Sequence, residues 1–118
     1  MLDLETFSPK SAKELLAGMI DVAKEIIGKE WVKVKSEITA YLSNMSIISM
    51  QTTHCLETGA IPKAQADLAL HGQEIAFNQF MLLSQFVAYE TASKVVDGVF
   101  NVIVSAIKNL TGITIFKT

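Results

Sequence analysis

The chain contains no arginine, one cysteine and only two prolines, and it has long stretches without charge. Arginine is the residue best suited to bidentate contacts with phosphate and guanine, so its absence and the net charge of −2 argue against nucleic-acid binding. The single cysteine, Cys55, cannot form an internal disulfide, and nothing in the sequence indicates an oxidising compartment. Residues 1–7 carry acids where a secretory signal needs basic residues, so we expect a cytoplasmic protein.

The rest of the composition is that of a folded domain. Half of the residues are hydrophobic, which excludes a disordered or low-complexity chain. At 118 residues the chain is long enough to bury a core without disulfides or a metal. We therefore expect residues 1–118 to form one domain.

Charge is concentrated near the N-terminus. Residues 1–37 hold seven acids and six lysines, whereas residues 38–89 hold only four charged residues and residues 75–89 hold none. A helix of a monomeric protein normally presents a charged face to water. The charge-poor stretch therefore predicts that more than one of its faces is covered, by other helices, by another subunit or by lipid.

Two helices are predicted in the first half of the chain. The capping-box pattern Ser11-x-x-Glu14 and apolar residues at helical spacing, ended by Gly28, predict a helix over 9–27. A second helix is predicted over 30–58, where the a and d positions of a heptad form a seam typical of long helices packed at shallow angles. The seam positions are Trp31, Val34, Ile38, Tyr41, Met45, Ile48, Thr52 and Cys55.

Further helix is predicted in the second half. Gly59 and Pro62 mark a tight reversal, because glycine permits a left-handed residue and proline favours the first helical position. Helical patterns then cover 62–89 and 91–110. No proline separates these segments, so one very long helix and two helices with a break near residues 90–93 both remain open.

These signals predict an all-α fold, an antiparallel up-and-down bundle of three to four helices followed by a flexible or β-prone tail at 113–118. Its centre would be the helical hairpin 30–58/62–89. A helix of about 28 residues spans about 42 Å, more than the diameter of about 35 Å expected of a compact chain of this size. We therefore expect oligomerisation to complete the bundle, with an interface at Ile47, Met50, Phe77, Phe80, Met81 and Phe86.

The residues with metal-binding chemistry are two histidines and two glutamates. His54 and Glu57 lie three residues apart, as do His71 and Glu74, and this spacing places each pair on one helical face. Folding the hairpin brings the histidines within about 6 Å of each other along the axis, and the donor set suits iron, manganese or zinc. The Glu-x-x-His pattern of di-metal carboxylate bundles is absent at both histidines. Surface side chains beside a loop are therefore the favoured interpretation.

Two other possibilities concern the same region. A His54–Asp67 pair across the hairpin would orient the histidine, as a catalytic base or as a structural hydrogen bond. Cys55 is adjacent to His54 and points about 100° away from it, so we interpret it as a buried small side chain rather than a nucleophile. The uncharged segments 38–56 and 75–89 are too polar or too short to be expected to span a membrane.

The sequence therefore favours a non-enzymatic structural or protein-interaction module. Its expected partner is itself, as a homodimer or larger assembly, or another protein, and no cofactor is expected. The alternative from a different class is a small metal- or ligand-binding bundle enzyme that uses the histidines and glutamates near the hairpin. That alternative would bring iron, manganese or zinc as its cofactor.

Overall fold

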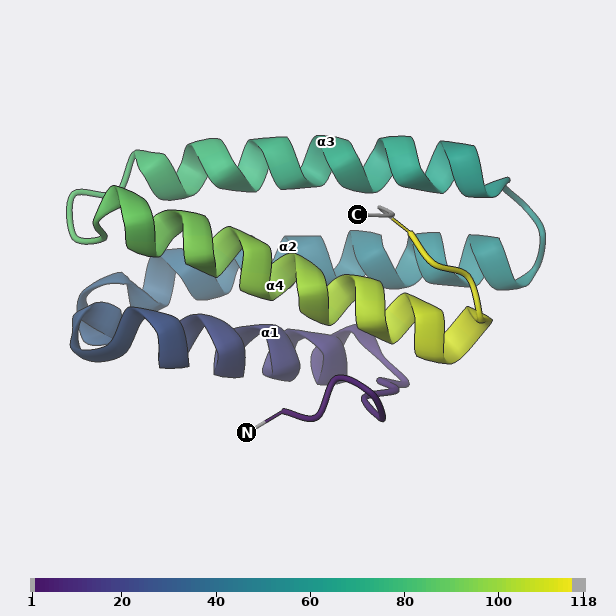
Figure 1. Ribbon diagram of the computed structural model, residues 1–118, viewed down its shortest axis with the longest axis horizontal. Helices are drawn as coiled ribbons and strands as arrows, with labels where there is room; N and C mark the ends of the chain where they lie inside the picture. The colour runs from purple at the N-terminus through teal and green to yellow at the C-terminus, as the bar shows by residue number, and fades with distance from the viewer. Residues whose placement is uncertain (1, 116–118) are drawn as a thin grey trace.

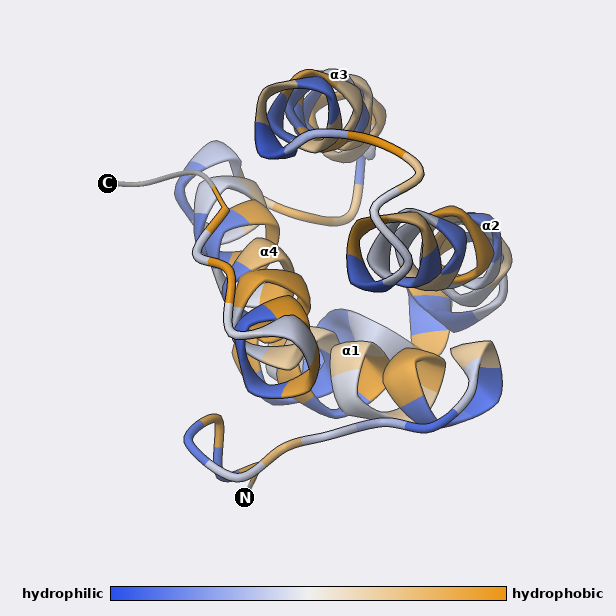
Figure 2. Cartoon of the chain, turned by 90° about the vertical axis from the view of Figure 1, so that its right-hand side faces the viewer, coloured by the Kyte–Doolittle hydropathy of each residue, from blue (hydrophilic) through white to orange (hydrophobic). Residues whose placement is uncertain are grey.

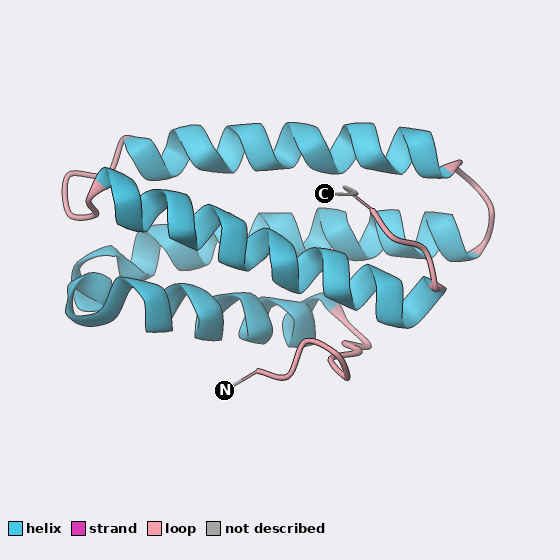
Figure 3. Cartoon of the chain, in the orientation of Figure 1, coloured by secondary structure: helices cyan, strands magenta, loops and turns pink. Residues whose placement is uncertain are grey.

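The computed structural model describes residues 2–115, which form helices and no strand (Figures 1 and 3). The all-α prediction is confirmed. The elements are α1 (Ala12–Ile27), the 3-10 turn η1 (Gly28–Glu30), α2 (Trp31–Glu57), α3 (Lys63–Leu82) and α4 (Tyr89–Thr111). No helix within this part of the chain is both long enough and apolar enough to cross a membrane.

The four α-helices lie along the long axis of the molecule, and the chain turns back at each connection (Figure 1). The molecule measures 41 × 25 × 24 Å, and its long axis matches the length of about 40 Å expected for the 27 residues of α2. Viewed from the end, α3 and α1 occupy opposite corners, with α2 and α4 between them (Figure 2). The most extensive contacts join α1 to α2 and to α4, and α2 meets α3 in fewer places. The α2–α3 hairpin is therefore less central to the packing than the sequence predicts.

The core lies between the apolar faces of all four helices. Apolar residues of α1 and α4 supply much of it, and α3 contributes a buried aromatic ring at Phe77. The centroid of this ring lies 5.4 Å from that of Tyr41 on α2 and 6.4 Å from that of Phe100 on α4. The ring of Phe80 stacks on Tyr41 at 4.4 Å. These aromatic contacts tie α3 to its two neighbours.

The first helix begins three residues later than predicted, because Ser11 is its N-cap. The Ser11 hydroxyl accepts the Glu14 N–H at 3.2 Å, and the Glu14 carboxylate in turn accepts the Lys10 N–H at 3.0 Å. This is the reciprocal pattern of a capping box, shifted by one residue on the carboxylate side. Gly28 ends α1 with a φ of 71°, a conformation in which glycine is favoured.

The third helix ends at Leu82, well before the predicted boundary at residue 89. Residues 83–88 form a loop, so 62–110 contains two helices and the break expected near residues 90–93 lies earlier. The Ser84 hydroxyl accepts the Phe86 N–H at 3.3 Å, which gives the loop a local turn. Val87 is then buried, and Ala88 is extended as the N-cap of α4. Val87 is the one buried residue of this loop, which contains neither proline nor glycine.

The buried face of α2 departs from the predicted heptad seam. Three predicted positions, Tyr41, Ile48 and Cys55, are half-buried or exposed, and the residue that follows each is buried instead: Leu42, Ser49 and Leu56. A seam written with a repeat of 3.5 residues drifts by about 20° per heptad on a straight helix with 3.6 residues per turn. The drift moves the buried face by one residue in the second half of α2.

The chain continues past α4 against the core. Gly112 ends α4 in the left-handed conformation, and its N–H donates to the Lys108 carbonyl at 2.7 Å. Ile115 is fully buried and Ile113 packs against the core. Residues 113–115, for which a flexible or β-prone tail is predicted, lie against the core and form no strand. Residues 116–118 of that prediction lie outside the described residues.

Candidate functional site

The predicted metal-binding residues divide into a pair and two separate side chains. On α3, His71 Nδ1 lies 3.6 Å from Glu74 Oε1, with His71 59% and Glu74 32% exposed. His54 and Glu57 are exposed near the end of α2. Across residues 2–115 no three or more His, Cys, Asp or Glu side chains converge closely enough to share a metal ion. The three-residue spacing therefore produces one local contact, between His71 and Glu74, and α2 and α3 do not bring the four residues together.

The other residues singled out near the hairpin have ordinary surface surroundings. The Asp67 carboxylate accepts a hydrogen bond from Lys63 Nζ at 2.8 Å, an ion pair within the first turns of α3. Cys55 is half-buried beside the shifted face of α2. Neither geometry assembles a nucleophile with a base.

The six predicted interface residues are divided between the core and the surface. Phe77 and Met81 are fully buried within the single chain, which corrects their assignment to a subunit interface. Met50 and Phe80 are partly buried and pack against the same core. Ile47 is 46% exposed and Phe86 39% exposed, so these two leave apolar surface open on the single chain.

A line of exposed apolar residues on α3 lies outside the predicted interface. Leu68, Ile75 and Leu82 lie seven residues apart on α3 and are 73%, 50% and 42% exposed. The exposed positions between them complete a heptad-like line that we call the α3 seam: Gln65, Leu68, Gly72, Ile75, Gln79 and Leu82. None of these residues is an acid or a lysine. Figures 1 and 2 show α3 at one edge of the molecule, where part of its surface faces away from α2 and α4.

The α3 seam is exposed because the other helices cover only the inner side of α3, although both sides carry apolar residues. Its inner side buries Ala66, Leu70, Phe77 and Met81 against the other helices. The charged or titratable residues of α3 are neighbours of the seam rather than members of it, and Glu74 and Asp97 line a groove between α3 and α4 together with the seam residues Ile75 and Gln79. A helix that is apolar on both sides is typical of a buried helix, yet this one has neighbours on one side only.

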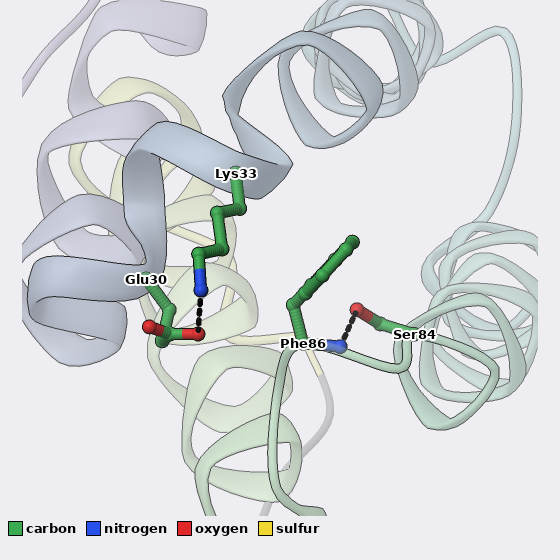
Figure 4. Close-up of polar contacts among 4 residues, drawn as sticks. All are labelled: Glu30, Lys33, Ser84 and Phe86. Carbon is green, nitrogen blue, oxygen red and sulfur yellow. Dashed lines mark hydrogen bonds and ion pairs between the residues drawn. The ribbon is translucent and has the colours of Figure 1, made fainter.

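A cleft opens between the start of α2 and the 83–88 loop. It encloses about 350 Å³ and is lined by Val34, Glu37, Ile38, Phe80, Met81, Leu83, Ser84, Gln85 and Phe86. Lys33 Nζ lies 5.7 Å from the centre of the Phe86 ring and 3.4 Å from a Glu30 carboxylate oxygen, beside the Ser84–Phe86 turn (Figure 4). The lysine covers an aromatic ring that would otherwise be more exposed to water. Mostly apolar walls with one acid make this cleft suited to an apolar group rather than to group-transfer chemistry.

Comparisons of the chain with protein-family models, with curated proteins and with solved structures gave no match. The functional assignment therefore depends on the geometry of the described residues.

Proposed function

We propose that the chain is a non-enzymatic interaction module that forms a homo-oligomer, in which an up-and-down antiparallel bundle is completed by contact between copies. The observation that carries this proposal is the α3 seam, a line of exposed positions on α3 in which leucine or isoleucine alternates with glutamine or glycine and none is an acid or a lysine. Scattered apolar residues are normal on a protein surface, but apolar residues that recur every seven positions along one exposed helix face favour an interface.

Burial of the α3 seam supplies the driving force. Complete burial of a leucine or isoleucine side chain is worth about 1.5–3 kcal/mol, and Leu68 still exposes 73% of its surface in the single chain. The seam has no charged residue whose desolvation would offset this gain. A second copy of the chain presents an identical seam, so contact between two copies buries it on both.

The test compares two substitutions that introduce the same charge at the same residue type. Ile75 on the α3 seam is 50% exposed, and Ile47 on α2 is 46% exposed and lies in the middle of its helix. Light scattering coupled to size exclusion should show a concentration-dependent dimer for the wild type and for Ile47→Asp. Ile75→Asp should remain monomeric, with an unchanged helical circular dichroism spectrum.

Other outcomes would point elsewhere. A monomeric wild type up to millimolar concentration would refute self-association. A dimer that Ile47→Asp disrupts and Ile75→Asp preserves would move the interface to the side of α2 that carries Ile47, one of the six interface residues predicted from the sequence. Phe80, another of the predicted interface residues, is a poor position for a charge substitution, because its ring stacks on Tyr41 at 4.4 Å and the loss of this contact would disturb the single chain.

The metal-dependent alternative retains only the His71–Glu74 contact among its four proposed ligands. It is tested by elemental analysis of the same chromatographic peak from protein purified without added metal. Near-stoichiometric iron, manganese or zinc that disappears in His71→Ala would favour this alternative. The cytoplasmic location stays a prediction.

A further inference from the structure

The clearest indication of how two copies meet comes from Gly72. Of the six glycines, three adopt a positive φ: Gly28, Gly59 and Gly112. At Gly18 and Gly98 an added Cβ would come within 2.7–2.8 Å of a neighbouring side chain, which would have to shift, so close packing favours glycine there. Gly72 has neither reason, because it lies within α3 and a Cβ built on it meets nothing within 4 Å. Nothing within the single chain explains a glycine at this exposed helical position.

Gly72 also occupies the middle of the α3 seam. The seam residues are separated by three, four, three, four and three positions, the alternation of a and d sites on helices that pair along their length. Leucine or isoleucine fills every second site, and the intervening sites hold glutamine or glycine. Large and small or polar sites therefore alternate along one line.

Resting on the self-association described above, we propose that two copies pair through antiparallel α3 helices that cross at Gly72. In this arrangement residue n of one copy lies opposite residue 147 − n of the other. Ile75 then lies over the partner's Gly72, and Leu68 lies opposite the partner's Gln79. The remaining layer joins Leu82 to the partner's Gln65. Every layer sets a large apolar side chain against a glycine or glutamine, so the two surfaces interlock.

The antiparallel direction is favoured over the parallel one for two reasons. A parallel pair would set Gly72 against its own copy and leave a void, while Ile75 would crowd its own copy. It would also bring like charges level at Lys63, Asp67 and Glu74 and align the two helix dipoles. In the antiparallel register Lys63 and Asp67 lie level with uncharged residues of the partner, Ser84 and Phe80, whereas the two Glu74 residues stay within about one residue of each other along the axis in either direction.

The size of the contact predicts a weak dimer. From Gln65 to Leu82 the seam is about 26 Å long, at 1.5 Å per residue. One helix face of this length is smaller than the surface of about 800 Å² per partner that standard interfaces bury. The dimer should therefore dissociate on dilution, and the experiment has to be run over a range of chain concentrations.

Disulfide trapping tests the register in the full-length chain. Cys55→Ala removes the native thiol, and two further variants then carry Leu68→Cys or Gln79→Cys. Positions 68 and 79 lie opposite each other in the proposed register, whereas each lies about 16 Å along the axis from its own copy. A disulfide requires Cα atoms within about 7 Å. Under mild oxidation a mixture of the two variants should form the mixed 68–79 disulfide, identified by mass spectrometry, and neither variant alone should cross-link.

The outcomes separate this inference from the proposed function. Cross-linking of each variant with itself would indicate a parallel pair, and a dimer by light scattering without the mixed disulfide would place the contact elsewhere. Either result overturns the register and leaves self-association intact. A chain that stays monomeric at every concentration overturns both. Cys55→Ala alone provides the background, and light scattering of each reduced variant confirms that dimerisation survives the substitution.

Discussion

Replacing Gly72 by alanine should have opposite effects on the single chain and on the dimer. Glycine in a helix interior costs about 1 kcal/mol relative to alanine, and the added methyl group meets nothing within 4 Å in the single chain. The free energy of unfolding should therefore rise by about 1 kcal/mol at concentrations where the protein is monomeric. For a chain of this size the midpoint of thermal unfolding should rise by roughly 3–6 °C.

The same methyl group should weaken the dimer. In the proposed register it points at the partner's Ile75, and overpacking of a close contact costs about 1–3 kcal/mol. At about 1.4 kcal/mol per factor of ten, the dissociation constant should rise by roughly 5- to 150-fold. Sedimentation equilibrium measures this constant, and urea unfolding of dilute protein measures the stability of the monomer.

Gly98→Ala is the matched control. A Cβ at Gly98 would lie 2.8 Å from Val22 Cγ1 and 2.9 Å from Ile26 Cδ1, so alanine there should lower the stability of the monomer. A Gly72→Ala chain that gains stability but keeps the wild-type dissociation constant would show that Gly72 lies outside the interface. A Gly72→Ala chain that loses stability as a monomer would contradict the helical environment described for α3.

Three further predictions concern the single chain. Phe77→Ala should lower the free energy of unfolding in urea by about 3–5 kcal/mol, because this fully buried ring leaves a cavity. Asn109→Ala removes two hydrogen bonds, of 3.0 and 2.8 Å, from its side-chain amide to the carbonyls of Leu4 and Phe7, and should cost about 1 kcal/mol. The Asn109→Ala chain should also show faster amide hydrogen exchange in the N-terminal segment, because that segment loses these two hydrogen bonds. Ser49→Ala should raise the melting temperature by several degrees, because the Ser49 hydroxyl is buried with no hydrogen-bond partner within the described part of the chain.

Where local chemistry sets a helix boundary, the sequence predicts it well. Gly28 and Gly59 have positive φ values, and both lie at the ends of helices where the sequence places them. The end of α3 is different, since residues 83–88 contain neither glycine nor proline, and the feature that sets this loop apart is the burial of Val87 in the folded chain. Tertiary packing of this kind leaves no local signal in the sequence.

The candidate sites depend on information that spacing does not contain. A separation of three residues places His71 beside Glu74 on one helix, and the structure shows that contact. Convergence with His54 also requires a particular rotation of α2 relative to α3, which a repeat along one helix does not determine. Spacing alone places Leu68 and Ile75 on one line of α3. Only the structure shows that this line is exposed and that the buried residues of α3 lie on its other side.

The second half of α2 shows why a lack of charged residues in the sequence, taken alone, predicts a larger interface than the structure supports. This segment buries four hydroxyl residues, Ser46, Ser49, Thr52 and Thr53, while Ile47 and Ile48 remain at the surface. Three of the four hydroxyls donate to carbonyls of their own helix at 2.7–2.9 Å, so most of this polar strip is buried without a partner from another element. Packing within one chain therefore accounts for much of the missing charge in α2. It does not account for α3, where apolar residues and an unexplained glycine face water, and this difference confines the proposed contact between copies to the α3 seam.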